Sequence, residues 1–137
     1  MARHADGPDD LVARIRSVCL SLPEAHEEQA WVGTRWRIRT RTFAHVLEVD
    51  SGWPPAYARA AGVDGPATIL MFRSSSPELE ALLRSGHPFF GTPWRPDEVG
   101  LVLEAAVDWD EIAELLTESY RVLAPRTLTR LLDQPPG

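Results

Sequence analysis

The chain has 137 residues, of which 44% are hydrophobic and 25% are charged, a balance that is typical of an ordinary globular protein. A chain of this length buries enough surface to fold as one domain without a disulfide or a metal, and its single cysteine has no second cysteine to bond with. The formal net charge of −6 argues against a general nucleic-acid coat, so contact with an anion requires a local cluster of basic residues.

Neither a targeting segment nor a membrane-spanning segment is recognisable in the sequence. No apolar run approaches the ~20 residues of a membrane span, and the N-terminus lacks an apolar stretch of signal-peptide length. We therefore expect a cytoplasmic protein that has no membrane partner. We also expect one domain over residues 9–133, with disordered ends at residues 1–8 and 134–137.

The first part of the chain predicts a helix followed by strands. Apolar residues at helical spacing predict a helix over residues 9–21, and Pro23 ends that pattern. From Arg35 the period changes to two, which predicts two strands joined by a hairpin turn at Thr40 and Arg41, or one continuous bent strand. The first strand alternates arginine with Trp36 and Ile38, and the second alternates Phe43, His45, Leu47 and Val49 with smaller or polar residues.

The middle of the chain predicts an irregular segment, a strand and a short helix. Prolines and glycines make residues 51–66 an irregular excursion with room for one helical turn, and the apolar run 67–72 predicts a strand. Ser76 and Pro77 predict the N-cap and the first position of a short helix that ends near Arg84.

A further strand is predicted over residues 99–103, and the helix after it has the clearest start signal in the chain. Asp108 is expected to cap this helix, because Glu111 follows three residues later as in a capping box. Pro125 ends the helix and opens a last short one. This order of elements predicts an α+β fold class with two layers, in which the helices pack on one face of a mainly antiparallel sheet.

The strongest local charge in the sequence is a ribbon of arginines in a stretch that has no acidic residue between Trp31 and Glu48. The ribbon consists of Arg35, Arg37, Arg39 and Arg41. Arginines at alternate strand positions point to one face, and their spacing of ~6.6 Å is close to the spacing of successive phosphates along a nucleic-acid strand. We therefore take the ribbon as a candidate nucleic-acid site, with DNA as the leading ligand.

Two other interpretations of the arginine ribbon stay open. It is either a solvated sheet face whose arginines pair with Glu24, Glu48 or Asp50, or a contact surface for an acidic protein partner. A nucleic-acid site requires the arginine side chains to be exposed and unpaired. A structural role requires a carboxylate near each of them.

A second candidate site is an aromatic loop set among proline and glycine residues. It consists of Trp31, Phe89, Phe90 and Trp94. Such a loop can line a small-ligand pocket, stack a nucleic-acid base, or simply cap one end of the core.

No sequence pattern indicates catalysis or metal binding. His26 stands beside two glutamates, and His45 lies three residues from Glu48, but these last two face opposite sides of the predicted strand. Cys19 belongs to the apolar pattern of the first helix, which is typical of an inert buried thiol. We therefore expect no catalytic residue, no metal, no cofactor and no enzymatic activity.

Several separated segments resemble the MmcQ/YjbR family of small bacterial proteins, in a shared order and spacing over residues 11–132. They are Ser21-Leu22-Pro23-Glu24, Trp36-Arg37-Ile38-Arg39 with Thr42-Phe43-Ala44, Phe72-Arg73-Ser74, Gly86-His87-Pro88-Phe89-Phe90, and Leu115-Leu116-Thr117-Glu118-Ser119-Tyr120-Arg121 with Ala124-Pro125. The resemblance implies a two-layer fold similar to CyaY-like domains, and it carries the DNA-binding label that this family has for a double-wing surface. We therefore expect a non-enzymatic module that binds nucleic acid, or alternatively a protein-interaction or small-ligand-binding domain that uses the aromatic loop.

Overall fold

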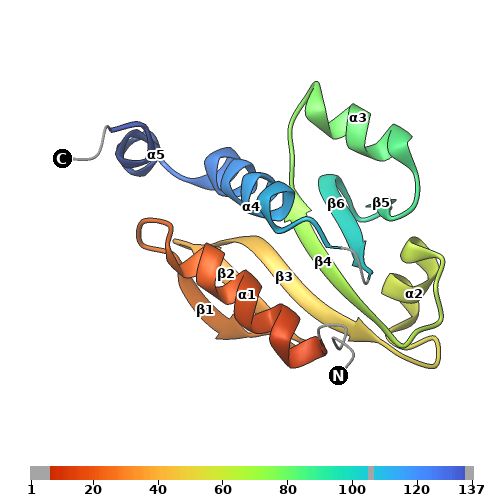
Figure 1. Ribbon diagram of the computed structural model, residues 1–137. Coiled ribbons are helices and arrows are strands. Elements are labelled where there is room, and N and C mark those ends of the chain that lie inside the picture. Colours follow the sequence, from red (N-terminus) through yellow and green to blue (C-terminus); the bar gives the residue numbers. More distant parts are fainter. Residues whose placement is uncertain (1–6, 105–106, 135–137) are drawn as a thin grey trace.

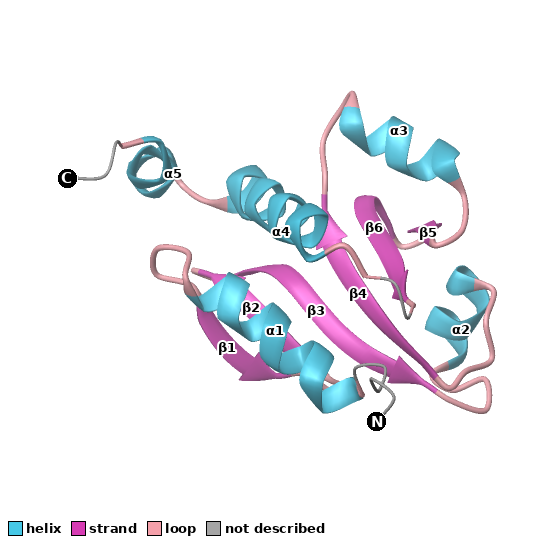
Figure 2. Cartoon of the chain, viewed as in Figure 1, coloured by secondary structure: helices cyan, strands magenta, loops and turns pink. Residues whose placement is uncertain are grey.

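The computed structural model describes residues 7–104 and 107–134, and these residues form five helices and six strands (Figures 1 and 2). The helices are α1 (Pro8–Leu20), α2 (Pro55–Ala61), α3 (Glu78–Ser85), α4 (Trp109–Leu123) and α5 (Arg126–Asp133). The strands are β1 (His26–Gln29), β2 (Thr34–Ile38), β3 (Arg41–Val49), β4 (Ala67–Arg73), β5 (Phe89–Thr92) and β6 (Arg95–Leu103). Of the ends expected to be disordered, residues 1–8 and 134–137, residues 1–6 and 135–137 lie outside the described residues, whereas Pro8 is the first residue of α1.

All six strands belong to one antiparallel sheet with the order β1-β2-β3-β4-β6-β5. The central strands β3 and β4 are mostly buried, and β1 and β5 form four-residue edges. The α+β class and the mainly antiparallel sheet are therefore confirmed.

The main hydrophobic core lies between the sheet and the two longest helices, α1 and α4, which cover one face (Figure 2). Trp36 of β2 and Tyr120 of α4 are both fully buried there. The predicted start of α4 is confirmed, because the Asp108 side chain accepts a hydrogen bond from the Glu111 backbone N–H at 3.1 Å.

Ser119 connects α4 to the two central strands through a buried hydroxyl. This hydroxyl donates to the Phe43 carbonyl at 2.6 Å and accepts from the Arg73 backbone N–H at 2.7 Å. These two backbone groups lie one position beyond the last paired residues of β3 and β4, Ala44 and Phe72. The hydroxyl therefore takes the place of a direct hydrogen bond between the strands.

The opposite face of the sheet carries a smaller apolar cluster beneath α2, which includes Leu47, Ile69, Met71 and Ala58. This short helix departs from the expectation that all helices share one face. It contacts β5 and β6, so among the described residues no helix covers the β1 and β2 side of this face (Figure 1).

The hairpin turn lies one residue earlier than predicted. Strand β2 ends at Ile38, which pairs with Arg41, so the turn residues are Arg39 and Thr40. Arg39 has a φ of 57°, the left-handed backbone that a tight two-residue hairpin turn requires. Arg39 therefore leaves the strand and does not continue the alternation of the ribbon.

The alternation predicted for β3 breaks at Phe43. The register shifts between Trp36 and Arg37, so β3 carries one extra residue at this point. Phe43 and Ala44 consequently both point into the main core, where the Phe43 ring lies edge-on to Tyr120 at 5.6 Å between centroids.

Two edge strands and one helix start differ from the sequence-based expectations. Strand β1 is short and polar, and β5 lies where an aromatic loop was expected, so neither has the long apolar alternation that signals a strand. Ser76 does not cap α3, because the helix begins at Glu78 and the Ser76 hydroxyl donates to the Glu80 carboxylate at 2.8 Å.

Candidate nucleic-acid interface

The arginine ribbon begins on β2, which lies between β1 and β3. Because Trp36 and Ile38 point into the main core, Arg35 and Arg37 point to the opposite face. The antiparallel register places Glu28 of β1 directly across from Arg35. These side chains therefore lie on the part of the sheet that α2 leaves open.

Glu28 is shared by the two arginines of β2. Arg35 Nη2 lies 2.8 Å from Glu28 Oε1, and Arg37 Nη1 lies 3.4 Å from Glu28 Oε2. The hydrogen bond from Arg35, assisted by the one from Arg37, holds the pKa of the Glu28 carboxyl below its usual value. One carboxylate thus compensates for two guanidinium groups, whose buried Nε atoms have no hydrogen-bond partner among the described residues.

The two arginines near the turn are more exposed. Arg39 Nε lies 3.3 Å from Glu24 Oε1, and both side chains are 56% exposed, so this pair is of the kind that contributes little to stability. Arg37 reaches the turn as well and donates to the Thr40 carbonyl. The Arg41 side chain is exposed and makes no ion pair within the described residues.

Three of the four ribbon arginines therefore have a carboxylate nearby, and two carboxylates face four guanidinium groups, which leaves an excess of two positive charges. Of the three acids considered from the sequence, only Glu24 pairs with the ribbon, and Glu48 accepts a hydrogen bond from Thr68 instead. Glu28 was not among them, because its role follows from a strand that the sequence does not signal.

The four residues of the predicted aromatic loop do not come together in one pocket. Phe89 packs against the main core, and Phe90 packs on the opposite face of the sheet. The Phe90 ring crosses directly over Gly100, where an added Cβ would lie 2.1 Å from the ring. Trp94 makes an edge contact with Tyr57 of α2 at 5.2 Å between ring centroids.

Two exposed tryptophans lie side by side, Trp31 from the turn between β1 and β2 and Trp53 from the segment between β3 and α2. Trp31 is 88% exposed, and its ring centroid lies 5.8 Å from that of Trp53, which is 50% exposed. His45 Nε2 lies 2.6 Å from the carbonyl of Val32, the residue after Trp31. Burial lowers the pKa of the His45 imidazole, and because a carbonyl oxygen can only accept, it is Nε2–H that donates in this bond. His45 thereby ties the turn that carries Trp31 to the sheet.

The described residues contain no candidate metal site and no candidate membrane span. Within residues 7–104 and 107–134, no three side chains of His, Cys, Asp or Glu are grouped so that they could hold a metal ion. No helix in this part of the chain is long and apolar enough to cross a membrane. Cys19 is fully buried in the main core, and burial raises the pKa of its thiol.

Comparison with known proteins agrees with the resemblance noted in the sequence. A Deinococcus radiodurans protein with a DUF419 domain has the same fold with a TM-score of 0.60 and 20% identity, over 96% of this chain and 91% of that one. A Pseudomonas syringae protein also has a TM-score of 0.60, with 12% identity over 85% of this chain and 98% of that one. None of the curated proteins matches the chain.

At such identities, the two solved structures establish a shared fold alone. The family is established by sequence, because the YjbR family model matches residues 20–122, from the end of α1 to the end of α4. The chain therefore belongs to the YjbR family.

Proposed function

We propose that this protein is a non-enzymatic binding module that holds a nucleic-acid strand along the β2–β3 hairpin. The observation that carries this proposal is the excess of two positive charges on the ribbon, in a chain whose net charge is −6. Guanidinium groups on an open sheet face are suited to backbone phosphates, because they form charge-assisted hydrogen bonds to these anions.

The ion pairs divide the ribbon into two parts. Arg35 and Arg37 meet the condition for a structural role, because Glu28 pairs with both, so the phosphate contacts fall to Arg39 and Arg41. The pair between Arg39 and Glu24 is exposed and weak, so a phosphate can replace the carboxylate. Arg41 has no ion-pair partner among the described residues, so a phosphate can bind it without replacing a carboxylate.

The tryptophan pair favours a single strand as the ligand. Trp31 lies just before β2, and Arg41 lies just after the turn that follows β2. A nucleic-acid strand that runs along β2 therefore passes both residues. Stacking of a base on an exposed aromatic ring contributes about 1–3 kcal/mol per base, and it needs a base that is free of its partner strand. Duplex DNA would use the arginines alone.

Fluorescence anisotropy with labelled single-stranded and duplex oligonucleotides across a salt series tests this proposal. Neutralising two phosphates on a single strand gives a log–log salt slope of about −1.4, at roughly −0.7 per contact. The double variant Arg39→Gln, Arg41→Gln should weaken binding to every sequence and flatten the slope, because phosphate contacts carry no base preference. Trp31→Ala should weaken the single strand more than the duplex.

Arg59→Gln is the matched control, because Arg59 is exposed on α2, which contacts β5 and β6. Absence of binding at low salt, or equal binding by wild type and the hairpin variant, would overturn the nucleic-acid assignment. The exposed Trp31–Trp53 pair then favours the alternative, a domain that binds a protein or a small ligand through these rings.

A further inference from the structure

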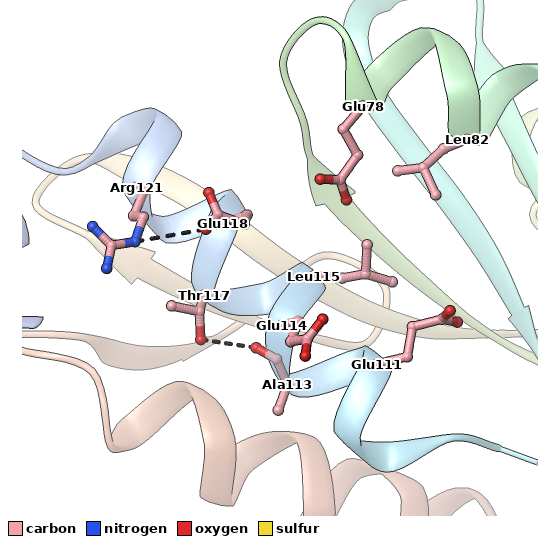
Figure 3. Close-up of a pocket in the computed structure, with 9 residues that line it drawn as sticks. All are labelled: Glu78, Leu82, Glu111, Ala113, Glu114, Leu115, Thr117, Glu118 and Arg121. Atoms are coloured by element: carbon pink, nitrogen blue, oxygen red, sulfur yellow. Dashed lines mark hydrogen bonds and ion pairs between the residues drawn. The ribbon is translucent and has the colours of Figure 1, made fainter.

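Helices α3 and α4 stand apart and leave a groove with a volume of about 570 Å³ (Figure 3). Leu82 from α3 and Leu115 from α4 extend into it, as do Glu78 from α3 and Glu111 from α4 (Figure 3). The groove is therefore apolar at its centre, and its walls carry four glutamates and one arginine, Arg121.

Most of the four glutamates that line the groove lack a countercharge in the described part of the chain. Glu78, Glu111 and Glu114 make no ion pair there, and Glu118 is paired only with Arg121, at 3.7 Å. The three glutamates of α4 are spaced three and four residues apart on its outer face, and like charges at this spacing destabilise a helix. A cationic occupant would remove this repulsion.

Helix α5 has the complementary character. Arg126 and Arg130 are exposed and lie one helical turn apart, and Leu131 beside them is 48% exposed. Neither arginine makes an ion pair within residues 7–104 and 107–134. An eight-residue helix is about 12 Å long, and the wall of α4 from Glu111 to Arg121 is about 15 Å long, so the helix fits the length of the groove.

Helix α5 does not lie in the groove of its own chain. Leu128 packs into the main core, and Asp133 Oδ1 lies 2.8 Å from Arg121 Nη2. These contacts hold α5 beyond the C-terminal end of α4, on the side of the molecule away from α3 (Figure 1). Within residues 7–104 and 107–134, the groove is therefore left open to another molecule.

We propose that two copies of this chain associate reciprocally, each placing its α5 in the α3–α4 groove of the other. Arg130 meets Glu114 and Arg126 meets Glu118, so that α5 runs antiparallel to the α4 of the other copy, and Leu131 covers the apolar centre. The same contact occurs twice about a twofold axis, so the assembly closes as a dimer. The contact is small, so the association is weak and depends on salt.

Sedimentation velocity at protein concentrations from about 1 µM to about 1 mM tests this proposal, because that range covers weak association. The dimer fraction should rise with concentration and fall with added salt. Glu114→Arg and Arg130→Glu should each raise the dimer Kd by at least about 100-fold, because every dimer then contains two contacts between like charges. Arg59→Glu, a charge reversal on exposed α2, should leave the Kd unchanged.

A mixture of the two reversed variants provides the sharpest test. In a mixed dimer, one contact joins the reversed groove to the reversed helix, and the other joins an unchanged groove to an unchanged helix. The mixture should therefore dimerise like wild type although neither variant does so alone. A wild type that stays monomeric throughout the range, or a mixture that stays monomeric, overturns the proposal. Circular dichroism melting verifies folding, and the pair Glu118→Arg with Arg126→Glu replaces Glu114→Arg with Arg130→Glu if Glu114→Arg does not fold.

Discussion

The β1 edge of the sheet and the α3–α4 groove both present neighbouring glutamates, but they differ in how these charges are compensated. On β1, Glu27 accepts hydrogen bonds from Arg16 Nε at 2.7 Å and from Trp36 Nε1 at 2.8 Å. Glu28, beside it, serves Arg35 and Arg37. In the groove, only one of the four glutamates has an ion-pair partner among the described residues.

The difference comes from the kind of secondary structure that carries the charges. An antiparallel ladder places cross-strand neighbours ~5 Å apart in a fixed register, so each glutamate of β1 has a donor directly opposite it. The groove lies between two helices with no ladder between them, and its α4 wall carries acids at the spacing where they face one another. Two groups of glutamates that look alike in the sequence therefore differ in how far neighbouring side chains compensate their charge.

The largest predicted effect separates the two faces of α4. Ser119→Ala should lower the free energy of unfolding by about 3 kcal/mol, because it leaves two buried backbone groups, the Phe43 carbonyl and the Arg73 N–H, without a partner. Glu118→Ala, on the outer face of the same helix, should change it by less than about 0.5 kcal/mol. Urea denaturation of both variants measures the contrast, and equal losses would remove the distinction between the faces.

The next prediction concerns the β1 edge. Glu27→Ala should lower the free energy of unfolding by about 2 kcal/mol, because it removes the acceptor of the buried Trp36 indole N–H together with the partner of Arg16. Glu27→Gln should lose less, since an amide oxygen can still accept from the indole. Glu114→Ala in the groove is the matched control, and a loss there as large as at Glu27 would contradict the comparison.

The pH dependence of stability should also originate at the β1 edge. The hydrogen bond from Arg16 holds the pKa of Glu27 below its usual value near 4.5, and Arg35 has the same effect on the pKa of Glu28. A carboxyl whose pKa is lower in the folded state than in the unfolded state stabilises the protein at pH values above the unfolded-state pKa. This stabilisation is lost as the pH falls through the folded-state pKa. Urea midpoints between about pH 6 and about pH 3 should therefore fall less steeply for Glu27→Gln and Glu28→Gln than for wild type. Equal slopes would show that the acid sensitivity lies elsewhere.

The smallest effect is expected in the groove. Glu114→Gln should raise the free energy of unfolding by about 0.3 kcal/mol in dilute protein, because it relieves repulsion from Glu111 and Glu118. The gain should vanish at about 1 M salt, where the screening length is about 3 Å. Thermal melts of the two proteins at low and high salt measure it, and a gain that persists at high salt would have to come from another source.

Features that depend on neighbours in sequence are the ones that could be predicted. The Asp108 cap needs only the residues that follow it, and the shared direction of Arg35 and Arg37 needs only the period of a strand. The hairpin turn was misplaced by one residue, because Arg39 takes a left-handed conformation without glycine or asparagine to signal it.

Features that depend on register or on distant contacts could not be predicted. Ser119 bonds to groups 46 and 76 residues away, and no local pattern announces such a role. Glu28 becomes the partner of two arginines only through the register of β1 on β2. Trp31 meets Trp53 because two separate turns converge, so the aromatic surface differs from the loop expected from composition.

The short edges of the sheet bear on how the protein behaves when it is concentrated. Edge strands of four residues expose few unpaired backbone groups, and three of the four side chains of β1 are His26, Glu27 and Glu28. At the other edge, α2 and α3 lie against β5. Because both edges are short, and each is charged or covered by helices, an incoming strand finds few free backbone groups to pair with. We therefore expect solutions of the folded protein to resist amyloid-like fibre growth.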